Sequence, residues 1–231
     1  MADGSPNRPK ILRGAFVEFG LSVPPLVVAF QFNPVELSRN RSLRFSAPRG
    51  LQAGEAGDAL RKFHARQSDL TKVRDLQEVG VAEEAIAFEL RLDASDGLDE
   101  GDALAEQFGI APRLATLELM VQPKGESVLG QALGALLGSP GGFSFTKRPN
   151  PPLVLFVWGR KRVMPVNINA LAIAETEYSA DLNPIRATVA VQLTVIEGRS
   201  LPQLYTSAMR ESMAALNLAN LTDVQHVMIP G

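Results

Sequence analysis

The clearest pattern in the chain is an alternation of apolar and polar positions in its last third. From residue 187 to residue 195 every second residue is Ala, Val or Leu. A period of two over this length predicts a β-strand with one buried face. The apolar run at 153–158 and the extended segment at 163–173 predict two more strands, with an acidic turn after the second. We expect the rest of the chain to pack onto this sheet.

The first hundred residues repeat the pattern in shorter pieces. Strands are predicted at 11–19 and 26–32, and the prolines between them favour a turn, so these two strands form a hairpin. Asn33 and Pro34 end the second strand, because proline has no backbone donor and holds the preceding residue extended. The alternating segment 86–92 predicts a further strand.

Helical spacing of apolar residues appears in three places. Residues 111–121 carry it with a proline near the start, and although they would also alternate in a strand, helix is our prediction. One or two helical turns are expected at 103–108, capped by Asp99 or Asp102. The spacing at 204–221 predicts a C-terminal helix, followed by an extended tail.

The composition changes in two long stretches. Residues 46–80 are rich in Gly, Ala, Gln, Asp and Arg, which predicts an excursion off the sheet with a short helix near its end. Residues 122–150 are rich in Gly, Ser and Pro and are predicted to form a loop. The expected organisation is a flexible leader at 1–10, a β domain at 11–197 with these two insertions, and a C-terminal helix and tail at 198–231. The predicted fold class is mainly β with short helices (α+β).

Composition and charge exclude several kinds of function. The 231 residues include no cysteine, which removes disulfides, thiolate metal sites and a cysteine nucleophile. The net charge of −2 gives no strong field that would attract nucleic acid or anionic lipid. No apolar run approaches the roughly 20 residues that span a bilayer, and the leader lacks the pattern of a signal peptide. We therefore expect no nucleic acid, no membrane insertion and synthesis in the cytoplasm.

Residues suited to catalysis or metal binding are scattered. The two histidines, His64 and His226, lie in segments predicted to be peripheral, whereas a hydrolytic triad or a zinc site needs histidines beside converging partners. The acidic loop at 93–100 is superficially like a calcium loop, but its twelfth position is Leu104 instead of a glutamate. No phosphate-binding glycine motif is present. These observations predict no enzymatic activity, no metal and no cofactor.

A basic cluster follows the first hairpin. Arg39, Arg41 and Arg44 lie within six positions of one another on a predicted strand. Charged residues on an edge strand block unwanted pairing, and the same residues could instead form a rim that contacts a partner. A second basic cluster, at 160–162, includes Arg162.

Two stretches are similar to one known family. They are Phe30-Gln31-Phe32-Asn33-Pro34-Val35-Glu36-Leu37-Ser38-Arg39, and a set that runs from Pro152 through Trp158-Gly159, Met164-Pro165-Val166, Ile168, Tyr178 and Leu182-Asn183-Pro184-Ile185-Arg186-Ala187 to Gln192-Leu193-Thr194-Val195. They resemble the tube-like domain of baseplate proteins of contractile injection systems, the phage-tail-like particles whose inner baseplate includes a LysM-bearing component. The strand end Leu90–Asp93 also resembles this family, but no LysM module is recognisable after Gly198.

The resemblance implies a tail-tube-like β-barrel or β-sandwich that packs in a ring, hexameric in the family, around a central spike. It implies contacts with other baseplate, spike and tube subunits, assembly in the bacterial cytoplasm, force transmission and no catalysis. The candidate residues for contacts between subunits are Asn33, Pro34, Arg39, Arg41, Arg44, Arg162, Asn183 and Arg186. Two alternatives stay open: a monomeric β-barrel that binds a small ligand inside, and a carboxylate-dependent hydrolase.

Overall fold

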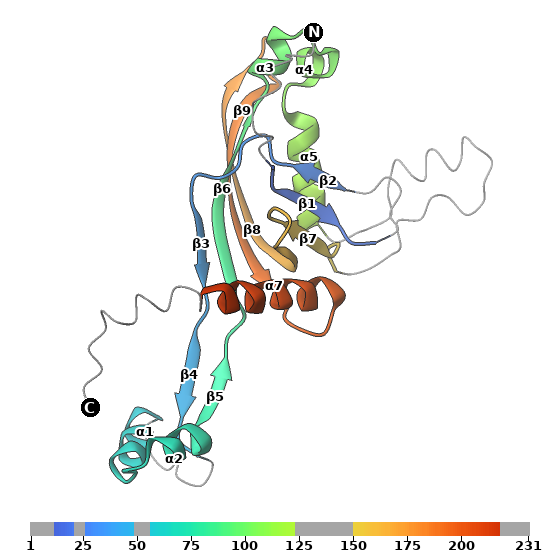
Figure 1. Ribbon diagram of the computed structural model, residues 1–231. Coiled ribbons are helices and arrows are strands. Elements are labelled where there is room, and N and C mark those ends of the chain that lie inside the picture. The colour runs from blue at the N-terminus through green and yellow to red at the C-terminus, as the bar shows by residue number, and fades with distance from the viewer. Residues whose placement is uncertain (1–11, 21–25, 49–55, 123–149, 218–231) are drawn as a thin grey trace, which may run out of the picture. The chain divides into compact units, whose positions relative to one another are not determined.

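The computed structural model describes residues 12–20, 26–48, 56–122 and 150–217 (Figure 1). The chain divides into two compact units. The sheet unit comprises Met1–Ser38 and Ile86–Gly231, and the arm unit comprises Arg39–Ala85. The excursion predicted at 46–80 lies within the arm unit. The predicted leader and C-terminal tail, and nearly all of the predicted loop at 122–150, fall outside the described residues.

Seven strands form one sheet in the order β2–β1–β7–β8–β9–β6–β3 (Figure 1). The neighbours from β2 to β9 in this order pair antiparallel. The β1–β2 hairpin, predicted from the sequence, is confirmed, with Phe16 opposite Val28. The strands are β1 (Ala15–Glu18), β2 (Val27–Ala29), β3 (Leu37–Asn40), β6 (Ala85–Asp93), β7 (Val154–Val157), β8 (Val163–Tyr178) and β9 (Pro184–Val195).

Alternation along the two longest predicted apolar patterns is confirmed. One face of each strand is buried in the core, and the other carries small or polar side chains. The buried residues are Ile86, Phe88, Leu90 and Leu92 on β6, and Ala187, Val189, Val191, Leu193 and Val195 on β9. The mainly β, α+β class is therefore confirmed.

The acidic turn predicted after residue 173 is wrong. Strand β8 continues to Tyr178, and Glu175 and Glu177 pair with Ala187 and Arg186 of β9. This part of β8 is exposed, so charged residues are tolerated on it, and no apolar alternation marks it in the sequence. The turn itself lies at Ser179–Asn183, where Ser179 N donates to Asn183 O at 2.8 Å.

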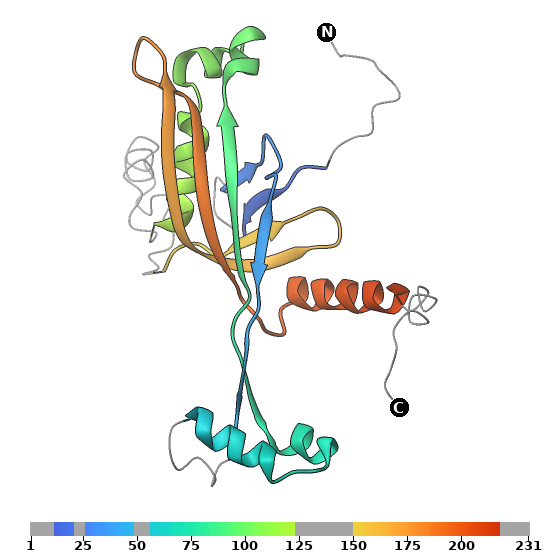
Figure 2. The same cartoon turned by 90° about the vertical axis from the view of Figure 1, so that its left-hand side faces the viewer.

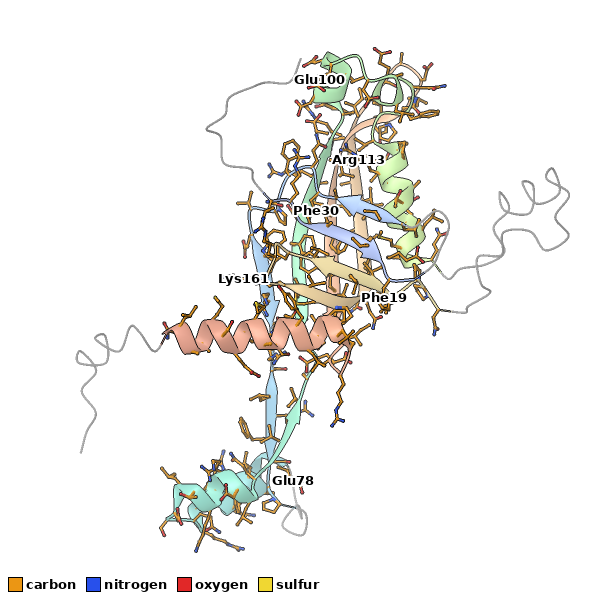
Figure 3. The ribbon with its side chains drawn as sticks, turned by 45° about the vertical axis from the view of Figure 1, so that its right-hand side comes forward. Phe19, Phe30, Glu78, Glu100, Arg113 and Lys161 are labelled. Atoms are coloured by element: carbon orange, nitrogen blue, oxygen red, sulfur yellow. The ribbon has the colours of Figure 1, made fainter. Side chains whose placement is uncertain are left out.

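The sheet curls around a cluster of phenylalanine rings. Strands β1 and β6 are four places apart in the sheet order, which in a flat sheet would separate them by roughly 19 Å. The rings of Phe16 on β1 and Phe88 on β6 have centroids only 6.1 Å apart. Phe30 and Phe156 complete the cluster, and Figure 3 shows Phe30 among the side chains inside the curl. The interior is therefore filled with aromatic side chains.

Three helices follow β6: α3 (Ser95–Asp99), α4 (Ala103–Phe108) and α5 (Ala111–Val121). The helices predicted at 103–108 and 111–121 are confirmed, and Asp102 caps α4 by accepting from Leu104 N at 3.0 Å. Helix α5 contacts both β2 and β8. It buries Leu114, Leu117 and Met120 in the same core as the phenylalanine rings.

The predicted C-terminal helix is present as α7 (Leu201–Asn217), and it extends away from the sheet (Figure 2). Its buried residues are Gln203 and Thr206, whereas Leu204 and Leu216 are exposed. Leu204 and Leu216 therefore do not dock the helix. Thr206 docks α7 by a polar contact: its hydroxyl accepts from Val163 N at 3.1 Å and donates to Val163 O at 2.8 Å.

The arm unit holds its own two-stranded sheet, formed by β4 (Leu43–Ser46) and β5 (Glu78–Val81). Between these strands lie α1 (Ala56–Ala65) and α2 (Leu70–Leu76), and α2 confirms the short helix predicted there. A small core forms around Phe63, with Ala47 and Ala59 buried and Leu60 and Val73 packed against them. No helix in the described part of the chain has the length and hydrophobicity to cross a membrane.

A substitution at Gly109 tests how closely the helices that follow β6 pack against Pro184 at the start of β9. Its φ is +56°, and a Cβ there would lie 2.1 Å from Pro184 O. We expect Gly109→Ala to lower the free energy of unfolding by about 3 kcal/mol or more, because backbone strain adds to a clash with a carbonyl that cannot move freely. Urea denaturation followed by Trp158 fluorescence measures this loss.

Gly101→Ala is the matched control for that substitution. Its φ is +70°, but nothing lies within 4 Å of the added Cβ. This substitution should lower the free energy of unfolding only by the backbone strain, which is about 1–2 kcal/mol. Equal losses in the two variants would contradict the close packing of Gly109 on Pro184.

Candidate interaction surfaces

Arg186, at the start of β9, is the centre of the densest polar network in the described sheet unit. Its Nε donates to Asp93 Oδ2 at 2.7 Å, its Nη1 to Glu177 Oε1 at 2.7 Å, and its Nη2 to Ser95 Oγ at 3.1 Å. The partners come from the end of β6, the end of β8 and the start of α3. One guanidinium therefore ties three elements together through the fixed fork of its donors.

Gln31 extends this network to the first hairpin. Its Oε1 accepts from Asp93 N at 3.0 Å and from Arg113 Nη1 at 2.8 Å. Arg113 lies on α5, and Figure 3 labels it. We call Gln31, Asp93, Ser95, Glu177 and Arg186 the Arg186 network. It joins residues of both stretches that carry the family resemblance.

The turn before Arg186 docks the helices that follow β6. Asn183 Nδ2 donates to Gln107 O at 2.9 Å, and Pro184 O accepts from Ile110 N at 2.9 Å. Asn183 was predicted to contact another subunit, and the structure shows its side-chain amide used within the chain. Leu182, in the same turn, differs: it is 79% exposed and has a φ of 62°, a conformation that is strained for a bulky residue.

Electrostatics favour the charged forms in the Arg186 network. Burial acts to raise the pKa of Asp93, but the hydrogen bonds from Ser95 and Arg186 outweigh it and hold that pKa below its ordinary value of 3.8. The hydrogen bond to Asp93, followed by the one to Glu177, raises the pKa of Arg186. Asp93 and Arg186 are therefore ionised at neutral pH.

Asn33 is also used within the sheet unit. Its Oδ1 accepts from Gly14 N at 2.9 Å, and its Nδ2 donates to Leu12 O at 2.8 Å. The amide thus extends the pairing of the β1–β2 hairpin by one step, while Phe30 N donates to Gly14 O at 2.8 Å. Pro34, which follows, is half-buried. This agrees with a turn role for the Asn-Pro pair, and a contact with another subunit stays a prediction.

In the arm unit, Arg39 and Arg41 share one buried carboxylate. Arg39 Nε donates to Glu84 Oε1 at 2.6 Å, Arg39 Nη2 contacts the same oxygen, and Arg41 Nη2 donates to Glu84 Oε2 at 3.1 Å. The Glu84 side chain is only 3% exposed. The carboxylate therefore pairs with two of the three arginines of the basic cluster.

Arg44 and Arg162 are the predicted residues whose charged groups are exposed and form no hydrogen bond or ion pair with the described residues. Arg44 lies on β4 opposite Gly80, and Arg162 lies in the turn between β7 and β8. The eight candidates are therefore divided between the two units and do not form one surface within either.

Two apolar surfaces were missed by the sequence reasoning. The first is one face of the β4–β5 ribbon, where Leu43 stands opposite Val81 and Phe45 opposite Val79, all of them 44–59% exposed. We call these four residues the ribbon face. In the sequence, the alternation of Val79 and Val81 could have indicated a strand with an apolar face. It was overlooked because the surrounding stretch was interpreted from its polar composition. The second is the outward side of α7, with Leu201, Leu204 and Leu216 exposed.

An open groove of about 1050 Å³ lies on the outer face of β6 and β9. Residues of segment 32–38, including Phe32 and Val35, form one wall, and Ala87, Glu89 and Gln192 lie on the floor. The groove is on the opposite side of the sheet from the phenylalanine cluster. It therefore differs from the enclosed apolar interior expected of a ligand-binding barrel.

Among the described residues, no group of three or more His, Asp or Glu side chains converges in a way that could hold a metal ion. His64 contacts Gln77 at 3.4 Å on the arm unit and lies apart from any such group. In comparisons with known proteins, no family model matches the chain, and no curated protein matches it significantly.

The Arg186 network predicts a pH-dependent contribution to stability. Because the pKa of Asp93 is lower in the folded chain than its ordinary 3.8, its carboxylate stabilises the fold above that pH, and this contribution is lost as the pH falls below it. Asp93→Asn should lower the free energy of unfolding at pH 7 by about 1 kcal/mol, since the group is partly exposed. The difference from the wild type should shrink below pH 3.8 in urea titrations at several pH values.

Asp99→Asn changes an exposed aspartate on α3 and is the control for that series. It should match the wild type at every pH. A deficit of Asp93→Asn that stays constant down to pH 2 would mean that the substitution acts by packing and not by charge.

The contacts of Glu84 with Arg39 and Arg41 are expected to stabilise the arm unit. Glu84→Gln leaves two arginines without their buried carboxylate, which should cost about 3 kcal/mol. Asp58→Asn, by contrast, removes only exposed contacts to Arg61 and Lys62 and should cost less than about 1 kcal/mol. Hydrogen exchange of the β4 and β5 amides measures both effects, and similar protection in the two variants would refute the role assigned to Glu84.

Proposed function

We propose that this chain is a structural subunit of the inner baseplate or tube-initiator region of a contractile injection system. In this role, copies of the chain form a ring that joins the central spike to the inner tube and transmits contraction. The chain acts as a scaffold and not as an enzyme. Its partners are other baseplate, spike and tube subunits.

The observation that carries the proposal is that residues of the two resembling stretches bind the same residue, Asp93. Gln31 and Asn33 belong to the first stretch, and Asn183 and Arg186 belong to the second. Gln31 and Arg186 both bind Asp93, at the strand end that also resembles the family. Residues far apart in the sequence thus form one network that shapes the sheet unit. This supports a common architecture as the basis of the resemblance, in preference to a chance match of short motifs.

Exposed apolar surfaces support an assembly role. The ribbon face, the outward side of α7 and Leu182 at the tip of the β8–β9 hairpin all expose large apolar side chains. Clusters of this kind mark surfaces that bind other proteins. The groove on the outer face of the sheet is open and lined in part by charged residues, so it gives no comparable support to the small-ligand alternative.

Electron microscopy tests the proposal. The full chain is co-expressed with the products of its genomic neighbours, and particles are purified through a tag on this chain. We expect rings or baseplate-like particles that contain it. Leu182→Gly, which relieves the positive φ while removing an exposed apolar side chain, should keep the fold and lower the yield of particles. A chain that is recovered only as a monomer without neighbours would overturn the proposal.

A further inference from the structure

The ribbon face is an apolar surface that the described part of its own unit leaves open. Its four side chains lie in direct cross-strand pairs, Leu43 with Val81 and Phe45 with Val79. A lone two-stranded ribbon is marginally stable in water. The ribbon also continues into α2, where Leu70 and Leu76 are exposed. This combination is typical of a surface that becomes covered when the protein assembles.

The charges beside the ribbon face indicate what covers it. Residues 56–76, which span α1 and α2, carry five Lys and Arg residues against the three acids Asp58, Asp69 and Asp75. Arg66 and Lys72 are exposed and have no side-chain partner among the described residues. The arm helices therefore present a net positive charge, and a second arm in the same place would be repelled. An acidic surface with exposed apolar residues is the complementary partner.

The sheet unit of the same chain has such a surface. Between Asp93 and Pro112 there is no Lys, Arg or His. Helices α3 and α4 expose acidic side chains, and with them Leu104 at 63% and Phe108 at 40%. We call residues 95–108, which span α3 and α4, the acidic knob. Figure 3 labels Glu100 in the knob and Glu78 on the arm unit. The exposed acids are Asp96, Asp99, Glu100, Asp102 and Glu106.

We propose that copies of this chain associate head to tail, with the ribbon face and basic helices of one copy bound to the acidic knob of the next. The apolar residues Leu104 and Phe108 cover the ribbon face, and the charges of the two surfaces pair around them. This contact uses two different surfaces, so each copy can bind two neighbours and a series of copies can close into a ring. The inference rests on the proposed function, because it names the contact between copies in that ring.

Charge reversal in two separate chains tests the contact. The arm variant carries Arg66→Glu and Lys72→Glu, and the knob variant carries Asp99→Lys and Glu100→Lys. All four side chains are exposed, and none of them caps a helix or belongs to a core, so both variants should fold. Self-association of the full chain is measured by sedimentation velocity and native mass spectrometry at low and high salt.

We expect the wild-type chain to form species larger than a dimer, more strongly at low salt. Each variant alone should associate at least about tenfold more weakly, because like charges then face each other. An equimolar mixture of the two variants should regain wild-type association, since every contact in an alternating ring again pairs opposite charges. Arg160→Glu with Arg199→Glu, which reverses two exposed charges elsewhere in the sheet unit, should associate like the wild type.

Three outcomes would overturn the inference. They are a wild-type chain that stays monomeric at all concentrations, a complex that stops at a dimer and does not respond to reversal of the knob, and a mixture of variants that fails to recover. If rings still form with the genomic neighbours in any of these cases, the proposed function stands and only the contact assigned here is wrong.

Discussion

The guanidinium of Arg186 is the contact on which the outer half of the sheet unit depends. At the other end, the phenylalanine rings hold the curl by dense packing, and no polar contact is needed. The β8–β9 hairpin continues past this core, and from Glu175 its β8 side chains are exposed. Apolar burial cannot hold that segment. Arg186 holds the segment by hydrogen bonds instead, because its planar guanidinium reaches Asp93, Glu177 and Ser95 at hydrogen-bond distance. The strand ends and the first turn of α3 are therefore positioned by directed polar contacts.

The same turn determines how the helices after β6 lie. Backbone donors of Ala94 and Ile110 bind the carbonyl oxygens of Ile185 and Pro184 at 2.9 Å, which places α5 along β8 and β2. The approach is so close that Gly109 has no room for a side chain. Docking by backbone leaves the acidic side chains on and between α3 and α4 exposed. The acidic surface is thus a consequence of how the helices are attached, since none of its carboxylates except the capping Asp102 is required for that attachment.

Much of this fold follows from the sequence because burial leaves a periodic pattern. Alternation identified β6 and β9, helical spacing identified α5, and Asp102 was one of the two residues predicted to cap α4. The end of β8 was missed, because strand pairing there depends on a charged network between residues 93 and 186 that no local pattern records. The way α7 docks was not predicted, since Thr206 binds the backbone of Val163 while Leu204 and Leu216 stay exposed. The buried ion pairs of Glu84 were not predicted either, because its two arginines are more than 40 positions away in the sequence.

The residues that define the fold differ from the residues that are exposed for contacts with partners. Asn33, Asn183 and Arg186 carry the resemblance and were the natural candidates for an interface, yet their polar groups are engaged within the chain. A residue in that position specifies an architecture, and replacing it would disturb assembly only by disturbing the subunit. In the ring proposed above, contacts between copies are made by exposed side chains such as Phe45 and Leu104, which lie outside the resembling stretches. Such a ring requires two unlike surfaces on each copy. In this proposal the opposite charges of the arm helices and of α3–α4 provide that asymmetry, because they favour arm-to-knob contact over any pairing of like surfaces.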